Sequence, residues 1–303
     1  MSAYPAGEAA AAFPLSEVLV ITDLAPASTN AVWRAALIAR ERGALLRVLH
    51  VSRERRLLAA VHDTLDAIGR QIHERLGIEP NVEVVEGELL PKAISAARGA
   101  GLLVIGSRRL NPLREWILGT QAERLIRLCR IPTLVVKQPA VPGRNAALGG
   151  PAEPGSYGRV LVSVDLRSEA VDLIAAAMTM SRDPHTEILH ALPANSQFRS
   201  TGSEAVAGSP GETAMRRAQS RLRDLVQSSG AHKVGAVAAV AFGDAAGCVL
   251  AKERASGTEL VVIGKRRRGL LADFILASVT QKVLAGSRSD VLVMPNKSVA
   301  QPA

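Results

Sequence analysis

The chain has 303 residues, of which 48% are hydrophobic and 21% charged, so it is long and apolar enough for two domains with cores of their own. Its two cysteines exclude a disulfide framework or a zinc ribbon and are typical of a reducing compartment. The formal net charge of +9 favours phosphate-bearing partners, whereas an aromatic content of 3% argues against binding of single-stranded nucleic acid.

No segment of the sequence predicts contact with a membrane. The longest strongly apolar run, Val234–Phe242, is much shorter than the roughly 20 residues that a membrane-spanning helix needs. The first 14 residues lack the basic flank of a signal peptide and carry Glu8 inside an alanine run, so we expect a disordered tail there. These features predict a soluble protein of the cytoplasm.

In the first part of the chain, short runs of β-branched residues alternate with helical patterns. The predicted strands are Val18–Asp23, Leu45–Val51, Val82–Glu86, Leu102–Gly106 and Thr133–Lys137. The predicted helices are Ser28–Glu41, Arg55–Leu76, Pro91–Arg98 and Thr120–Cys129. Strands that are apolar almost throughout indicate a parallel sheet covered by helices on both faces, and the alternation predicts a doubly wound α/β fold.

A proline- and glycine-rich stretch at residues 139–157 predicts a linker. Beyond it the same order of elements returns. The predicted strands there are Val160–Asp165, Ile188–Leu192, Val234–Phe242, Leu260–Gly264 and Val291–Pro295. A second soft segment, Pro193–Gly211, is rich in serine, glycine and alanine and predicts a mobile surface loop.

The second part of the chain repeats the first. VLVITDL at Val18–Leu24 returns as VLVSVDL at Val160–Leu166, and LLVIGSRR at Leu102–Arg109 returns as LVVIGKRR at Leu260–Arg267. Landmarks that recur in the same order with unequal spacing indicate a tandem duplication. We therefore distinguish a first repeat, residues 15–138, from a second repeat, residues 158–298, and expect a five-stranded parallel sheet in each.

Ligands of open α/β sheets bind beyond the carboxyl ends of the strands, where the strand order reverses. Asp23 and Asp165 close the first strand of each repeat, and His50 and His190 end the second strand. Asp23 either faces a ligand or caps the turn into the following helix, and the sequence favours neither interpretation. The two histidines fit a structural role better than a role in binding.

The sharpest chemical signal follows the fourth strand. Gly106 begins a Gly-Ser-Arg-Arg run, and a Gly119-Thr120 pair further on opens a helix. This arrangement places backbone N–H groups where phosphate oxygens can bind. Thr120 and Glu123 also have the spacing of a capping box, as do the residues that follow Ser278 in the second repeat, and a capping box needs no ligand. Both interpretations stay open.

Other chemistries find no support in the sequence. Gly264-Lys265 lacks the spacing of a P-loop, and Gly99-Ala-Gly101 precedes a strand, so the dinucleotide fingerprint is absent. His62 and His73 have no second metal ligand at a standard spacing, and no Gly-x-Ser-x-Gly elbow occurs. We expect no catalytic residue and no metal site, with a slow ATPase as the upper limit of any enzymatic activity.

The order, spacing and repetition of these motifs resemble two universal stress protein domains in tandem, with an adenine nucleotide α-hydrolase-like fold. Nucleotide-binding members of that family carry an aspartate at the end of the first strand and G-x2-G-x9-G-(S/T) after the fourth. Their aspartate and the backbone after the second strand approach adenine and ribose, and the glycine loop with its Ser/Thr holds the phosphates. By this resemblance, the nucleotide-binding residues of the first repeat are Asp23, Val51, Gly106, Arg109, Gly119 and Thr120.

The motif is incomplete in both repeats. Arg109 and Arg267 replace its second glycine, and Ala277 replaces its third glycine in the second repeat. If the second glycine has a positive φ, another residue there costs about 1–2 kcal/mol, but an arginine can also bind a phosphate with two hydrogen bonds. The degenerate second site comprises Asp165, Gly264, Arg267 and Ser278.

The resemblance implies a cytoplasmic stress-response regulator that binds ATP or a related adenine nucleotide, together with Mg²⁺ where the nucleotide carries it, mainly in the first repeat. The alternative is a stress-response scaffold that binds no nucleotide and acts through protein contacts. A slow ATPase and nucleic-acid binding through the arginine loops are weaker hypotheses. We expect the repeats to pair through their last strands as a pseudo-dimer, and a homodimer of the whole chain stays open.

Overall fold

The computed structural model describes residues 15–54, 58–109, 116–117, 119–140, 155–166, 170–182, 186–194, 210–265 and 278–295. The predicted tail at residues 1–14, most of the predicted linker and most of the predicted loop Pro193–Gly211 lie outside these ranges. The last two residues of that loop prediction, Pro210 and Gly211, instead open a helix.

The elements of the first repeat form close to where the sequence predicts them. Its strands are β1 (Glu17–Ile21), β2 (Leu45–Ser52), β3 (Asn81–Glu86), β4 (Leu102–Gly106) and β7 (Thr133–Val136). Its helices are α1 (Pro26–Arg42), α2 (Leu58–Leu76), α3 (Leu89–Ala96) and α4 (Thr120–Leu128). A short antiparallel ribbon of β5 (Arg108–Arg109) and β6 (Trp116–Ile117) lies in the sequence between β4 and α4.

The second repeat has the same order of elements. Its strands are β8 (Val160–Val164), β9 (Thr186–Leu192), β10 (Val237–Phe242), β11 (Leu260–Gly264) and β12 (Asp290–Met294). Its helices are α5 (Ala170–Met180), α6 (Pro210–Ser228), α7 (Ala245–Ser256) and α8 (Ser278–Gly286). The predicted start of the strand Val234–Phe242 is wrong. Val234 ends a 3₁₀ turn and Gly235 has a φ of 73°, which an extended strand cannot accommodate.

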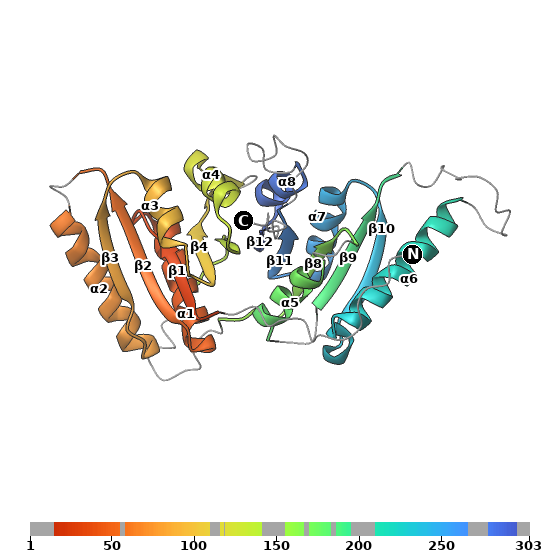
Figure 1. Ribbon diagram of the computed structural model, residues 1–303, viewed down its shortest axis with the longest axis horizontal. Coiled ribbons are helices and arrows are strands. Elements are labelled where there is room, and N and C mark those ends of the chain that lie inside the picture. The colour runs from red at the N-terminus through yellow and green to blue at the C-terminus, as the bar shows by residue number, and fades with distance from the viewer. Residues whose placement is uncertain are drawn as a thin grey trace, which may run out of the picture.

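The main strands of both repeats form one ten-stranded sheet in the order β10-β9-β8-β11-β12-β7-β4-β1-β2-β3. Within each repeat the five strands run parallel, as predicted. Between the repeats β7 and β12 pair antiparallel, with Leu134 opposite Leu292. The expected pairing through the last strands is therefore confirmed, and the two sheets continue into each other at the centre of the molecule (Figure 1).

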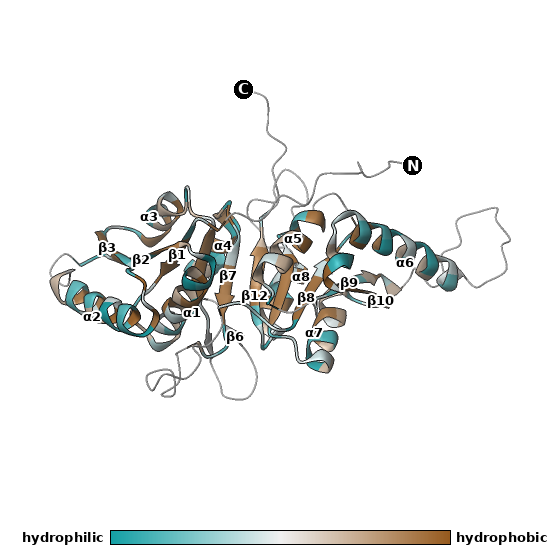
Figure 2. Ribbon diagram, turned by 90° about the horizontal axis from the view of Figure 1, so that it is seen from below, coloured by the Kyte–Doolittle hydropathy of each residue, from teal (hydrophilic) through white to brown (hydrophobic). Residues whose placement is uncertain are grey.

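Helices cover both faces of this sheet and form two cores. Helices α1, α2, α5 and α6 pack on one face, and α3, α4, α7 and α8 pack on the other. Each core runs from one repeat into the other, because alternate residues of each strand face opposite sides. Figure 2 shows the apolar strands in the middle of the molecule and the hydrophilic surfaces of α2 and α6 at its two ends. Among the described residues, every helix falls short, in length or apolar character, of what crossing a bilayer requires.

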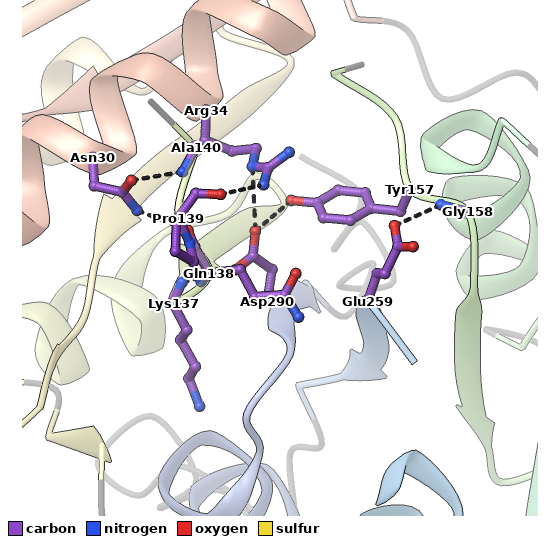
Figure 3. Close-up of polar contacts among 10 residues, drawn as sticks. All are labelled: Asn30, Arg34, Lys137, Gln138, Pro139, Ala140, Tyr157, Gly158, Glu259 and Asp290. Carbon is purple, nitrogen blue, oxygen red and sulfur yellow. Dashed lines mark hydrogen bonds and ion pairs between the residues drawn. The ribbon is translucent and has the colours of Figure 1, made fainter. Parts of the chain in front are cut away.

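A buried carboxylate joins the repeats where the strand direction changes (Figure 3). Asp290, the first residue of β12, accepts hydrogen bonds from the backbone N–H groups of Lys137 at 2.7 Å and Gln138 at 2.8 Å. The hydroxyl of Tyr157 donates to the same carboxylate at 2.7 Å. The guanidinium of Arg34 lies 3.5 Å from it and 5.1 Å from the centre of the Tyr157 ring. Burial raises the pKa of Asp290 and that of Tyr157.

The described end of the predicted linker is fixed against the first repeat. The carboxylate of Glu41 at the end of α1 accepts hydrogen bonds from the backbone N–H groups of Gly155 at 2.6 Å and Ser156 at 2.9 Å. A Cβ atom on Gly155 would lie 2.3 Å from the carbonyl oxygen of Leu37, so this close packing on α1 requires glycine. The chain thus crosses to the second repeat in contact with the first.

Candidate functional site

The sheet order places a switch point in each repeat. In the first repeat the chain moves from β1 outward to β2 and β3, and then returns to β4 on the other side of β1. The carboxyl ends of β1 and β4 therefore lie at the switch point, which is where open α/β sheets bind ligands. Asp23 lies beyond the end of β1 and Gly106 ends β4. In the second repeat, Asp165 and Gly264 occupy the same places at β8 and β11.

The exposed carboxylate of Asp23 holds the turn into α1. Its Oδ1 accepts hydrogen bonds from the backbone N–H of Ala25 at 3.0 Å and from the hydroxyl of Ser28 at 2.6 Å. These contacts hold the turn that precedes α1, but the N-cap of α1 is Ala25, and within the described residues no side chain caps this helix. The same carboxylate is exposed beyond the carboxyl end of β1.

Two strained residues at the site were missed by the sequence analysis. Leu24 has a φ of 63° and Leu166 a φ of 57°, and they are the two non-glycine residues with positive φ in the described part of the chain. Each follows the aspartate of its repeat, and left-handed backbone costs a leucine about 1–2 kcal/mol. In the first repeat the N–H of Leu24 donates to the hydroxyl of Thr22 at 3.0 Å. The recurring Asp-Leu dipeptide was the available signal.

The second strand of each repeat contributes a histidine with a structural contact. Nδ1 of His50 lies 2.9 Å from the carbonyl oxygen of Thr22, and Nδ1 of His190 lies 2.9 Å from that of Val164. Both histidines thus bind the end of the neighbouring first strand, which supports their structural interpretation. Val51, the residue after His50, is half-buried near the carboxyl end of β2.

Gly106 and Gly264 have different surroundings although they occupy equivalent positions. A Cβ atom on Gly106 would lie 2.4 Å from the carbonyl oxygen of Ala27 in α1, a distance that no side chain tolerates. A Cβ atom on Gly264 would meet only the side chain of Leu173, at 3.6 Å, which is ordinary van der Waals contact. Close packing of α1 therefore requires the glycine in the first repeat, independently of any ligand.

The capping box predicted at Thr120 is wrong. Gly119 is the N-cap of α4, with φ −59° and ψ 151°, and Thr120 is already the first helical residue, so its hydroxyl is one position too late to cap. Within the described residues no side chain caps this helix. Gly119 and Thr120 are both exposed, so the first turn of α4 presents N–H groups to solvent.

The corresponding helix of the second repeat is tied down at its first turn. The buried hydroxyl of Thr280 donates to the carbonyl oxygen of Gly264 at 3.2 Å, which links α8 to the end of β11. The first repeat has Ala122 at the equivalent position and lacks this link. Ser278 is exposed at the beginning of α8, and the residue before it lies outside the described residues, as does Arg267.

The strain expected at Arg109 does not arise. Its backbone pairs with Trp116 in the ribbon of β5 and β6, so it is extended and not left-handed. The position of the family's second glycine is thus occupied by a short strand in this protein. The arginine side chain lies outside the described parts of the structure.

A cavity of about 580 Å³ lies away from these residues. It is bordered by the second half of α2 and the beginning of β3, and its lining includes Asp66, His73 and Asn81. Because the beginning of β3 is at the amino ends of the parallel strands, the cavity lies at the opposite edge of the sheet from the switch point. None of the predicted site residues lines it.

Comparison with known proteins gives one family and several similar structures. The model of the universal stress protein family matches residues 15–137 and 156–295. A putative universal stress protein from Pseudomonas aeruginosa UCBPP-PA14 matches with a TM-score of 0.66 at 20% identity, covering 93% of this chain and 94% of that chain. A universal stress protein from Archaeoglobus fulgidus DSM 4304 has a TM-score of 0.66 at 18% identity, with 93% and 98% covered.

A functionally unknown protein from Pseudomonas aeruginosa PAO1 matches with a TM-score of 0.65 at 20% identity, and 93% of each chain is covered. At these identities the structures share the fold with this chain. No curated protein is similar enough in sequence to be matched.

Proposed function

Because the chain belongs to the universal stress protein family, we propose that it binds ATP or a related adenine nucleotide in its first repeat. The observation that carries the proposal is the convergence at the switch point between β1 and β4, where the exposed Asp23, the glycine end of β4 and the first turn of α4 follow neighbouring strands. In this proposal Asp23 and the backbone near Val51 contact adenine and ribose.

The phosphates would bind at the first turn of α4. Uncapped N–H groups at a helix N-terminus, together with the positive end of the helix dipole, attract phosphate oxygens. Gly119 leaves room for a close approach, since no atom of the described residues lies within 4 Å of a Cβ atom built there. Gly106 and Arg109 begin the loop that leads to this helix, and Thr120 adds an exposed hydroxyl.

The second repeat is proposed to have largely lost this site. Its Asp165 and Gly264 occupy the equivalent positions, but Ala277 and Arg267 replace glycines of the motif. The bond from Thr280 to Gly264 also closes the start of α8 against its own strand. We therefore assign nucleotide binding mainly to the first repeat.

The role that fits this arrangement is that of a cytoplasmic stress-response regulator that senses or buffers a nucleotide. The competing function is a scaffold that binds no nucleotide. It is favoured by one observation, which is that the carboxylate of Asp23 is already engaged by the N–H of Ala25 and the hydroxyl of Ser28. In a scaffold, the role of Asp23 is to hold the turn into α1 through these two hydrogen bonds.

Calorimetric titration of the full chain with Mg-ATP tests the proposal, accompanied by mass spectrometry of any small molecule that denaturation releases. The matched variants are Asp23→Asn and Asp165→Asn, which remove the same carboxylate from the two repeats. We expect Asp23→Asn to weaken binding about tenfold, the loss of one charge-assisted hydrogen bond, and Asp165→Asn to change it less than twofold. Absence of binding by the unmodified chain, or equal effects of the two variants, contradicts the proposal.

A further inference from the structure

Two buried lysines cross between the repeats. Lys265 follows Gly264 at the end of β11 and is 7% exposed. Its Nζ donates to the carbonyl oxygen of Cys129 at 3.2 Å, and Cys129 is the C-cap of α4 in the first repeat. A side chain of the second repeat therefore binds the carboxyl end of the helix whose first turn borders the proposed phosphate site.

Lys137 makes the reverse crossing. It follows β7 of the first repeat, is 5% exposed, and donates from Nζ to the carbonyl oxygens of Leu284 at 2.5 Å and Ser287 at 2.9 Å. These carbonyls are at the carboxyl end of α8. An ammonium group in this place satisfies carbonyls that have no partner within the helix and complements the negative end of the helix dipole.

The two lysines do not descend from one ancestral position. The residue of the first repeat that corresponds to Lys265 is Ser107, and the residue of the second repeat that corresponds to Lys137 is Pro295. The duplication therefore did not copy one contact twice. Each contact is particular to the pairing of these two unlike repeats.

The geometry assigns to Lys265 the role of a positioning residue for the nucleotide site of the first repeat, an inference that rests on the proposed function. Helix α4 has nine residues and buries Leu125 and Ile126 in the core, so it is a short, stiff element. Holding its carboxyl end also fixes where its first turn presents Thr120 and the N–H groups. Lys265 adjoins Gly264, the first residue of the second repeat's glycine loop. Its hydrogen bond to Cys129 therefore connects that loop to helix α4 of the first repeat.

Lys265→Met and Lys137→Met form a matched pair for the test, because each keeps the apolar stem and removes one buried crossing ammonium. Both are expected to lower the unfolding midpoint. Only Lys265→Met is expected to weaken Mg-ATP binding, by about five- to twentyfold, since Lys137 caps the helix of the degenerate site. Lys265→Arg restores a cation and is expected to recover binding to within about threefold of the unmodified chain.

Hydrogen exchange of the nucleotide-free protein separates this inference from the proposed function. We expect Lys265→Met to speed exchange in the first turn of α4 more than Lys137→Met does. If the unmodified chain binds no Mg-ATP but shows this difference, the proposed function fails, and what stands is that Lys265 fixes the first turn of α4. Equal exchange in the two methionine variants, or equal loss of Mg-ATP affinity, overturns the positioning role. Unchanged binding by folded Lys265→Met, in a chain that does bind Mg-ATP, overturns it as well.

Discussion

The two equivalent glycines at the strand ends illustrate how one residue type carries different constraints in the two repeats. A methyl group on Gly106 would collide with the backbone of Ala27, whereas one on Gly264 would touch only a flexible leucine side chain. We expect Gly106→Ala to lower the free energy of unfolding by about 1–3 kcal/mol, the usual cost of overpacking, because α1 must shift. Gly264→Ala should change it by less than about 1 kcal/mol. Urea unfolding of both variants measures this, and a cost for Gly264→Ala as large as that for Gly106→Ala would contradict it.

The buried ammonium group of Lys137 makes the free energy of unfolding depend on pH. Burial lowers the pKa of its ammonium group to about 8 from the ordinary value of 10.5, although Glu253 and Asp290 act in the opposite direction. Between these two values the unfolded chain holds the proton more tightly than the folded chain, so the free energy of unfolding rises as the pH rises. Between about pH 7.5 and 9.5, this group raises the free energy of unfolding by roughly 2 kcal/mol.

The measurement compares the unmodified chain with Lys137→Met by urea unfolding across this pH range. The comparison is needed because burial raises the pKa of the thiols of Cys129 and Cys248, and these groups reduce stability as the pH rises. The difference between the two proteins isolates the lysine. Parallel pH profiles would show that the Lys137 ammonium keeps an ordinary pKa in the folded chain.

Single residues also mark the limit of what the sequence could predict about the site. The aspartates and the glycines were found because they recur at equivalent places in both repeats. The positive φ of Leu24 and Leu166 was not found, because leucine as a residue type does not predict left-handed backbone and the recurring Asp-Leu dipeptide was the one signal available. The buried carboxylate of Asp290 was not found either, since its partners Arg34, Lys137 and Tyr157 are far from it in sequence.

At the scale of elements, α4 is open at its first turn and tolerant of a new N-cap. Gly119 has a φ of −59°, and in the described part of the chain a Cβ atom there would meet no atom within 4 Å. Gly119→Asp should therefore cap the helix and raise the free energy of unfolding by about 0.5–1 kcal/mol. The same carboxylate would occupy the anion position, so Mg-ATP affinity should fall about tenfold.

The control for this helix is Gly119→Ser, which caps without a charge. It should stabilise the protein by a few tenths of a kcal/mol and change nucleotide affinity much less than the aspartate does. Thermal unfolding and calorimetric titration of both variants provide the two readouts. Equal affinity for the aspartate and serine variants would place the phosphates elsewhere.

The elements themselves were largely predictable because continuous apolar runs identify buried parallel strands and period-3.6 patterns identify their helices. The errors occurred where a local backbone geometry decided the boundary. Gly235 delays β10 through its positive φ, and the Gly119 N-cap moves Thr120 inside α4. Residue type alone does not distinguish an N-cap threonine from one at the first helical position.

At the scale of the whole molecule, the continuous sheet and the two shared cores predict that the repeats unfold together. Asp290 is the critical contact, because it holds the backbone N–H groups of the two residues that follow β7 and lies beside Arg34 of α1. Asp290→Ala removes the carboxylate that faces a buried guanidinium and accepts from two backbone N–H groups, which should cost about 3–5 kcal/mol. Tyr157→Phe removes one hydrogen bond and should cost about 1 kcal/mol.

Calorimetry of these variants tests the coupling. The unmodified chain and Tyr157→Phe should each show a single transition, and Asp290→Ala should show two, one for each repeat. Two transitions in the unmodified chain would mean that the antiparallel β7–β12 contact is too weak to couple the repeats.

Because the two paired last strands belong to one polypeptide, their contact does not have to obey the symmetry that two identical chains impose on their interface. An assembly of two equal chains about a twofold axis repeats every side chain on both sides, so any residue that meets the axis meets its own copy. Here Lys265 contacts the first repeat, which has serine at the position equivalent to Lys265. Lys137 contacts the second repeat, which has proline at the position equivalent to Lys137. Because the two repeats belong to one polypeptide, their contact surfaces can be complementary without being identical. One repeat can therefore change its sequence while the other still supports it.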